Sequence, residues 1–150
     1  MEEIADFAEL LTARANGFDA AMGFRLVRAT VDEVVLEYEV AEHHKQPYGI
    51  VHGGLHCAAI ESACSIAASL NAISRNQGVV GVENHTSFVH AVRQGKVRVT
   101  ATPLSRGRRS QIWEATARDE SGRILSTGRV RLLCLDQGSD LAGEAVKPRG

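Results

Sequence analysis

One carboxylate stands out because no residue near it in the chain can neutralise it. The stretch from His52 to Ser74 has the composition of an apolar helix, and Glu61 is its only formally charged residue. Its helical neighbours three, four and seven positions away are glycine, alanine, cysteine and serine. An ionised carboxylate is costly to bury without hydrogen bonds or a chemical role. Glu61 is therefore a candidate catalytic residue, with a merely solvated helix face as the alternative.

The start of the same helix is a second candidate, because Gly53 and Gly54 follow His52 there. Backbone N–H groups in the first turn lack partners within the helix, and glycine lets a ligand carbonyl approach them closely. The helix dipole adds partial positive charge at this point, which favours an oxygen that gains negative charge. Most Gly-Gly pairs only allow a tight turn or close packing, so the pair alone is weak evidence.

The spacing of the two candidates has a geometric consequence. Gly53 and Glu61 are eight residues apart, which is about 12 Å along an α-helix. One ester or thioester cannot contact both on one helix, so joint action requires a second, antiparallel helix and predicts a two-fold dimer with two equivalent sites. Ser65 shares the face of Glu61 and could orient the carboxylate or a water, or could be a small packing residue.

Bulk properties restrict the class of protein. A chain of 150 residues is the length of one domain. The formal net charge of -1 gives no general attraction to nucleic acid or to an anionic membrane surface. The N-terminus lacks the basic start and apolar core of a secretory signal, and no run has the length of a membrane span. We expect a cytoplasmic protein with neither a nucleic-acid nor a membrane partner.

The cysteine and histidine residues do not indicate a metal or a disulfide framework. There are three cysteines, and Cys57 and Cys64 fall on the apolar helix, where cysteine behaves as a small hydrophobic residue. His52 and His56 are four residues apart and could share a helical face, but no HExxH motif accompanies them. We therefore expect no metal site.

Hydrophobic periodicity predicts an α+β protein. A short amphipathic helix is expected over residues 3–15, and a polar loop over 41–51. Alternating segments predict six strands, at 25–30, 33–40, 79–87, 96–104, 111–119 and 123–135. Short connections between the last three favour antiparallel pairing. The domain is expected to span residues 1–135, followed by a polar, disordered tail over 136–150.

The long helix must be covered on most sides, because it is apolar nearly all round. A strongly curved antiparallel sheet of five to six strands could wrap it. One curved sheet rarely covers every face of a helix, so a second copy of the chain is the expected source of the remaining cover.

Three segments resemble one enzyme family. They are YGIVHGGLHCAAIESACS, VVGVENHTSFVHAVRQGKVRVTATPL and WEATARDESGRILSTGRVRL. Over roughly residues 20–135 the chain resembles the hotdog-fold acyl-CoA thioesterases, in which a sheet wraps one central helix and dimers hold two interface sites. The most similar branch contains the Arthrobacter-type 4-hydroxybenzoyl-CoA thioesterase and the thioesterases of menaquinone and enterobactin synthesis. The resemblance therefore implies an acyl-CoA thioesterase, with aryl-CoA substrates favoured.

The resemblance also implies roles for individual residues. The backbone N–H of Gly53 would polarise the thioester carbonyl, and Gln46 would bind near that oxygen. Glu61 of the partner chain would act as nucleophile or general base, with Ser65 orienting the attacking water. His52 would shape the loop. Related branches have aspartate at the position of Glu61, so the glutamate favours the 4-hydroxybenzoyl type over the phenylacetate-pathway type.

Further contacts are expected with the substrate. Gly54 and His90 would lie near the acyl-CoA, although residues 89–91 replace the arginine and proline usual in relatives. The cluster Arg106, Arg108 and Arg109 could bind the phosphates of coenzyme A, or could form a solvated turn. No cofactor is expected, because coenzyme A is part of the substrate. The homodimer is expected to pair further into a dimer of dimers.

Two other functions remain open at this point. The same fold could serve as a non-catalytic acyl-CoA sensor, but such regulators usually carry a DNA-binding segment, which neither end resembles. A hydratase or dehydratase of the same superfamily would rely on a histidine with a carboxylate or amide. The HGG element argues against that reading, while His52 and His56 keep it open.

Overall fold

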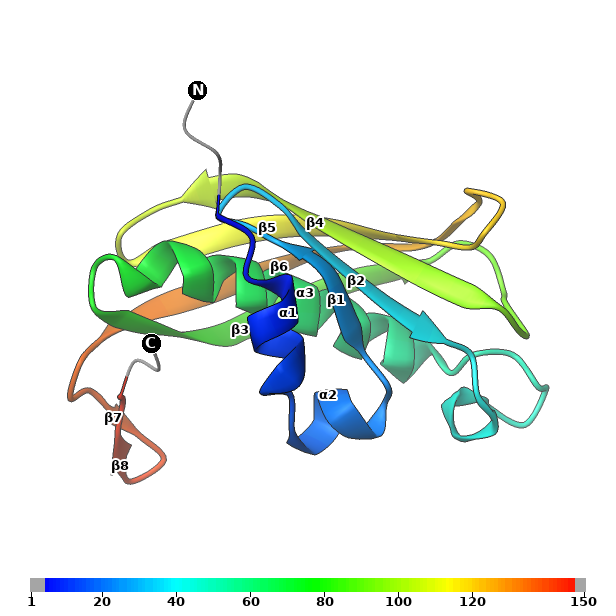
Figure 1. The fold of residues 1–150 in the computed structure, drawn as a ribbon, viewed down its shortest axis with the longest axis horizontal. Helices are drawn as coiled ribbons and strands as arrows, with labels where there is room; N and C mark the ends of the chain where they lie inside the picture. Colours follow the sequence, from blue (N-terminus) through cyan, green and yellow to red (C-terminus); the bar gives the residue numbers. More distant parts are fainter. Residues whose placement is uncertain (1–4, 148–150) are drawn as a thin grey trace.

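The structure, a computed structural model, describes residues 5–147. Six strands form one antiparallel sheet in the order β1-β2-β4-β5-β6-β3, and one long helix, α3 (Gly53–Ile73), lies across a face of it (Figure 1). The strands are β1 (Arg25–Ala29), β2 (Val34–Glu39), β3 (Gln77–Phe88), β4 (Lys96–Arg106), β5 (Ser110–Arg118) and β6 (Ile124–Asp136). The predicted α+β class and the single long helix are confirmed, with strand ends shifted by a few residues.

Small side chains let α3 lie close to the sheet. Its buried face is rich in alanine, and Ala59, Ala63 and Ala67 are almost fully inaccessible. The core between helix and sheet also holds Trp113, whose indole N–H donates to the side chain of Gln111 at 2.9 Å. The Gln111 amide in turn donates to the Ala68 carbonyl at 3.1 Å, which ties the middle of the helix to β5.

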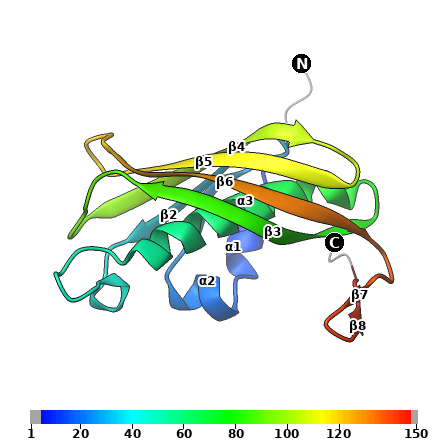
Figure 2. The ribbon, with the colours of Figure 1, turned by 180° about the vertical axis from the view of Figure 1, so that it is seen from behind.

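Strand β3 runs beside α3 and forms one edge of the sheet. It pairs with β6 along its whole length (Figure 2), and its other side has no neighbouring strand within the described part of the chain. A bulge interrupts the register between Gly81 and Glu83. Bulges re-aim side chains and are common next to functional sites.

The N-terminal region differs from the predicted helix over 3–15. Residues 3 and 4 lie outside the described residues, and the helix observed, α1 (Ala8–Ala13), is followed by an unexpected short helix, α2 (Gly17–Ala21). Asp6 accounts for the late start of α1. Its carboxylate accepts hydrogen bonds from the backbone N–H groups of Ala8 at 3.0 Å and Ala29 at 2.9 Å, which joins α1 to β1.

The expectation of a disordered tail is wrong for residues 136–147. Strand β6 continues to Asp136, and β7 (Asp140–Leu141) and β8 (Glu144–Ala145) form a small hairpin. Backbone hydrogen bonds in both directions join Val146 to the segment 138–139. Its side chain packs on Gly78 of β3. Residues 148–150 of the predicted tail lie outside the described range. None of the described helices is long and apolar enough to span a membrane.

Candidate active site

Two neutral donors hold the Glu61 carboxylate. The Ser65 hydroxyl donates to Oε1 at 3.3 Å, and the Asn84 amide nitrogen donates to Oε2 at 3.0 Å. Across residues 5–147, no cation lies within salt-bridge distance of this carboxylate. The group is half-buried, so it is oriented without being neutralised. A carboxylate in this state can accept a proton or attack an electrophilic carbon.

Strand β3 supplies the support for that carboxylate. The Asn84 amide also donates to the Cys57 carbonyl at 3.1 Å, while its oxygen accepts from the Thr86 hydroxyl at 2.6 Å. These contacts fix which end of the amide faces Glu61. Sequence reasoning did not single out Asn84 or Thr86. The alternation of the strand could have found them, because positions 84 and 86 share one face.

Gly81 lets the carboxylate approach the backbone of β3. A β-carbon added at this position would lie 2.1 Å from Oε1 of Glu61, closer than any real contact. The bulge begins at the same residue. Glycine is therefore required at position 81 for the carboxylate to occupy its observed place, since only glycine leaves this space open.

The start of α3 offers one backbone donor. His52 is the N-cap residue, and its Nδ1 accepts the N–H of Gly54 at 2.8 Å. That bond occupies the Gly54 N–H. The N–H of Gly53, by contrast, has no partner among residues 5–147. The Phe88 ring lies directly against Gly53, where an added β-carbon would come within 2.8 Å of the ring. Gly53 therefore has both a free donor and an apolar cover.

The loop before α3 presents the side chain of Gln46. Its backbone N–H donates to the Ile50 carbonyl, and its own carbonyl accepts from Gly49, each at 2.9 Å. The left-handed φ of 76° at Gly49 closes this turn. The side-chain oxygen of Gln46 accepts the N–H of Tyr48. The amide NH₂ group has no partner in the described part of the chain, so it remains able to donate to a ligand oxygen.

A buried histidine, His44, also holds the loop that precedes α3. His44, in the short 3-10 helix η1 (Glu42–His44), accepts the Ala41 N–H on Nδ1 at 3.0 Å and contacts the Met22 carbonyl through Nε2 at 2.9 Å. Its carbonyl accepts the His52 N–H at 2.9 Å. Burial lowers the pKa of His44, which keeps the ring neutral. Sequence reasoning missed this role because the partners are remote in the chain.

His56 and His52 do not converge on a common ligand. The His56 ring is buried, with Nδ1 3.3 Å from the Ser126 hydroxyl and its centroid 6.0 Å from that of Phe88. Burial lowers the pKa of His56 as well. Across the described residues, no group of three or more histidine, cysteine or acidic side chains is placed to hold a metal ion.

The predicted arginine cluster lies far from the helix start within one chain. Arg106 forms an ion pair with Asp32 at 2.7 Å, and Arg108 and Arg109 occupy the turn between β4 and β5. A hydrogen bond from Arg75, just after α3, reaches Gly107 in this turn. The turn therefore adjoins the C-terminal end of the 21-residue helix, about 30 Å from Gly53 along the axis.

The structure thus forms two groups from the predicted residues. Glu61 and Ser65 form one group halfway along α3. Gln46, His52 and Gly53 form the other at the helix start. His90 joins neither through a hydrogen bond, because its Nδ1 donates to the Ile124 carbonyl at 2.7 Å near the end of β3.

Comparisons with known proteins agree with this fold. Residues 48–126 match the family described as "Thioesterase superfamily". A Mycobacterium tuberculosis protein named "Putative esterase" is 40% identical over 121 residues, covering 79% of this chain and 86% of that protein. Its solved structure has a TM-score of 0.78 and covers 79% of this chain and 96% of that one.

A second solved structure adds to this likeness. A thioesterase from Haemophilus influenzae has a TM-score of 0.81 at 27% identity, covering 90% of this chain and 93% of that one. The similarity extends over the central helix and the sheet, so the expected hotdog fold is confirmed. This chain belongs to the thioesterase superfamily.

Proposed function

We propose that the protein is an acyl-CoA thioesterase whose site combines residues of two protomers. The observation that carries the proposal is the placement of an oriented, unneutralised carboxylate and a free helix-start donor on one unbroken helix. Their separation of about 12 Å is too large for one thioester group. A second copy of the helix, running antiparallel to the first, would bring Glu61 of one protomer to Gly53 of the other.

The exposed edge of the sheet supports such a dimer. Strand β3 is 12 residues long, and Val82, Phe88 and Val89 on or next to it are at least half exposed. Long unpaired edges with apolar side chains invite pairing with another chain. Pairing along β3 would cover these residues and place the two α3 helices close together. The further association into a dimer of dimers stays a prediction.

The proposed reaction uses both groups. The Gly53 N–H and the Gln46 amide donate to the thioester oxygen and stabilise the negative charge that develops there. Glu61 of the partner protomer either attacks the carbonyl carbon or removes a proton from a water held near Ser65. The C–S bond breaks, the coenzyme A thiolate leaves and takes up a proton, and water supplies the second oxygen of the acid.

The turn between β4 and β5 is the proposed site for the coenzyme A phosphates. From Glu61 to the end of α3 is about 18 Å, so the turn beside that end would lie beyond the catalytic groups. Arg108 and Arg109 are exposed there, whereas Arg106 already pairs with Asp32. The resemblance implies an aryl-CoA preference, which competes with the hydrocarbon-chain preference that the apolar cavity beside α1 favours. The cytoplasmic location stays a prediction.

The alternatives gain less support from the geometry. A hydratase would need a histidine facing the reacting carboxylate, but His52 caps the helix and His56 is bonded to Ser126. A non-catalytic sensor would not need Glu61 to be oriented by two donors in a site without a neutralising cation.

A thiol-release assay over aromatic, short-chain and long-chain acyl-CoA substrates tests the proposal. Glu61→Gln should lower kcat at least about 10²-fold, because it removes the base or nucleophile. Glu39→Gln changes an exposed glutamate on β2 and is the matched control. Near-normal hydrolysis by Glu61→Gln across the panel would refute the assignment.

A further inference from the structure

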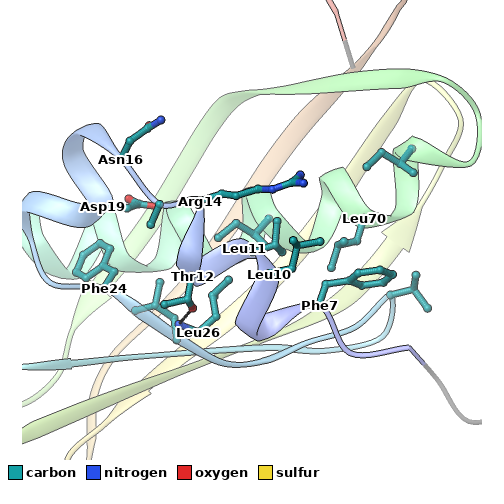
Figure 3. Close-up of a pocket in the computed structure, with 15 residues that line it drawn as sticks. Phe7, Leu10, Leu11, Thr12, Arg14, Asn16, Asp19, Phe24, Leu26 and Leu70 are labelled. Carbon is teal, nitrogen blue, oxygen red and sulfur yellow. Dashed lines mark hydrogen bonds between the residues drawn. The ribbon is translucent and has the colours of Figure 1, made fainter. Parts of the chain in front are cut away.

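A large apolar cavity lies between α1, α2, β1 and the flank of α3 (Figure 3). Its volume is about 590 Å³, within the range of roughly 300–1,000 Å³ found for small-molecule sites. The helix contributes Ile66, Leu70 and Ile73, which form one stripe along its surface. This stripe lies roughly 120–180° around the helix from Glu61, so the cavity and the carboxylate occupy different sides of α3.

The cavity wall is nevertheless hydrogen-bonded to the residue that follows the carboxylate. Asp19 lines its wall and accepts a hydrogen bond from the hydroxyl of Ser62, the residue after Glu61, at 2.7 Å. Ser65, which contacts Glu61, directly precedes Ile66 in the cavity wall. Ser62 and Ser65 thus lie on the helix surface between the carboxylate and the cavity, so a hydrocarbon chain that joins the two would have to cross these small side chains.

The cavity changes character along its length. Figure 3 shows Asn16 and Asp19 at the end formed by α2, whereas Phe7 and Leu70 lie toward the other end. Two of the polar groups in the wall are engaged: Asp19 accepts from the Ser62 hydroxyl, and the Thr12 hydroxyl accepts the Leu26 N–H at 3.1 Å. A chain entering beside Asp19 would thus end among apolar side chains.

We infer that this cavity holds the hydrocarbon tail of a medium-chain or long-chain acyl group whose thioester carbon lies at Glu61 of the same protomer. The inference rests on the proposed thioester hydrolysis. The volume of the cavity favours a hydrocarbon chain over a single aromatic ring. A cavity of about 150 Å³ is enough for benzene, so one ring would fill only about a quarter of this cavity. The stripe from Ile66 to Ile73 extends about 10 Å along the helix, which suits an extended chain.

Chain-length dependence of hydrolysis tests the inference. We expect kcat/KM for saturated acyl-CoA substrates to rise about fourfold per added methylene from butyryl-CoA until the cavity is filled. Decanoyl-CoA should exceed benzoyl-CoA at least tenfold. Leu70→Trp, which fills the cavity, should lower the ratio of decanoyl to butyryl kcat/KM at least tenfold. Leu104→Trp is the control, because Leu104 is an exposed leucine on β4 outside the cavity.

Three results would overturn the inference: a flat chain-length profile, a preference for benzoyl-CoA, or the same ratio in both tryptophan variants. Calorimetry can separate failure of this inference from failure of the proposed function. It would measure the binding of butyryl-CoA and decanoyl-CoA to Glu61→Gln, with and without Leu70→Trp. Tighter decanoyl binding that Leu70→Trp abolishes would support the cavity even if no thioester is hydrolysed. Hydrolysis that depends on Glu61 but ignores chain length would leave the function standing without the cavity.

Discussion

The carboxylate of Glu61 lies against the bare α-carbon of Gly81, where an added methyl group would come within 2.1 Å of Oε1. One residue on the edge strand thus sets the position of the one acidic residue on the central helix. The bulge in β3 begins at this same glycine, and bulges bend a strand and re-aim its side chains.

Gly81→Ala should lower kcat/KM at least tenfold while the protein still folds. The new methyl group forces the flexible Glu61 side chain away from its observed position. This disturbs the alignment of the carboxylate more than it lowers the stability of the fold. Gly78→Ala is the matched control on the same strand, because its methyl group would meet only the Val146 side chain. Steady-state kinetics and thermal melts of both variants check this, and equal activity of the two would contradict it.

Asn84→Ala should reduce kcat by about tenfold, because Glu61 loses one of its two donors and the Thr86 hydroxyl loses its acceptor. His85→Ala changes the neighbouring residue, whose side chain points to the opposite face of the strand. Its kcat should stay close to that of the unaltered protein. If both alanine variants lose the same activity, Asn84 has no particular role in orienting the carboxylate.

His52→Ala should destabilise the protein by about 1 kcal/mol, because the variant lacks the side chain that caps α3. The Gly54 N–H would then be free and the helix start less well ordered, so kcat should fall as well. His52→Asn can cap the helix and should recover much of the stability. Urea unfolding of the three proteins measures the effect, and an unchanged free energy of unfolding in His52→Ala would exclude the capping role.

Acidification should destabilise the fold through two buried histidines. Burial lowers the pKa of both His44 and His56 below the ordinary value of 6.5, so the unfolded chain binds protons that the folded chain does not. Their contribution is fully present above pH 6.5 and is lost as the pH falls toward their folded-state pKa values. The free energy of unfolding should decrease between pH 7.5 and pH 5.5, and His44→Gln should reduce this dependence. An identical pH dependence in His44→Gln would show that the ring is not kept neutral by the fold.

The sequence predicted those features that depend on local patterns. The alternation in 96–104 and 123–135 located β4 and β6, and the run from His52 to Ser74 located α3 almost to the residue. The expectation that Ser65 shares a face with Glu61 follows from the helical repeat, and the two side chains are in contact.

Features that depend on remote partners escaped prediction. Asp6 joins the start of α1 to β1 by accepting the Ala29 N–H, and His44 holds the loop through Met22. No local pattern reveals such pairs. Likewise Asn84 reaches Glu61 only because α3 and β3 pack together. The small C-terminal hairpin closes through turns in which Gly138 and Gly143 have left-handed backbone angles, within a segment whose polar composition indicated disorder.

Complementation between two inactive variants tests the two-protomer site most directly. Glu61→Gln lacks the carboxylate, and Gln46→Ala lacks a donor at the helix start. Unfolding and refolding the two together in equal amounts would make about half of the dimers mixed, each with one intact site, and should restore about a quarter of the original activity. Activity equal only to the mean of the two separate variants would show that each site lies within one chain, and would contradict the account.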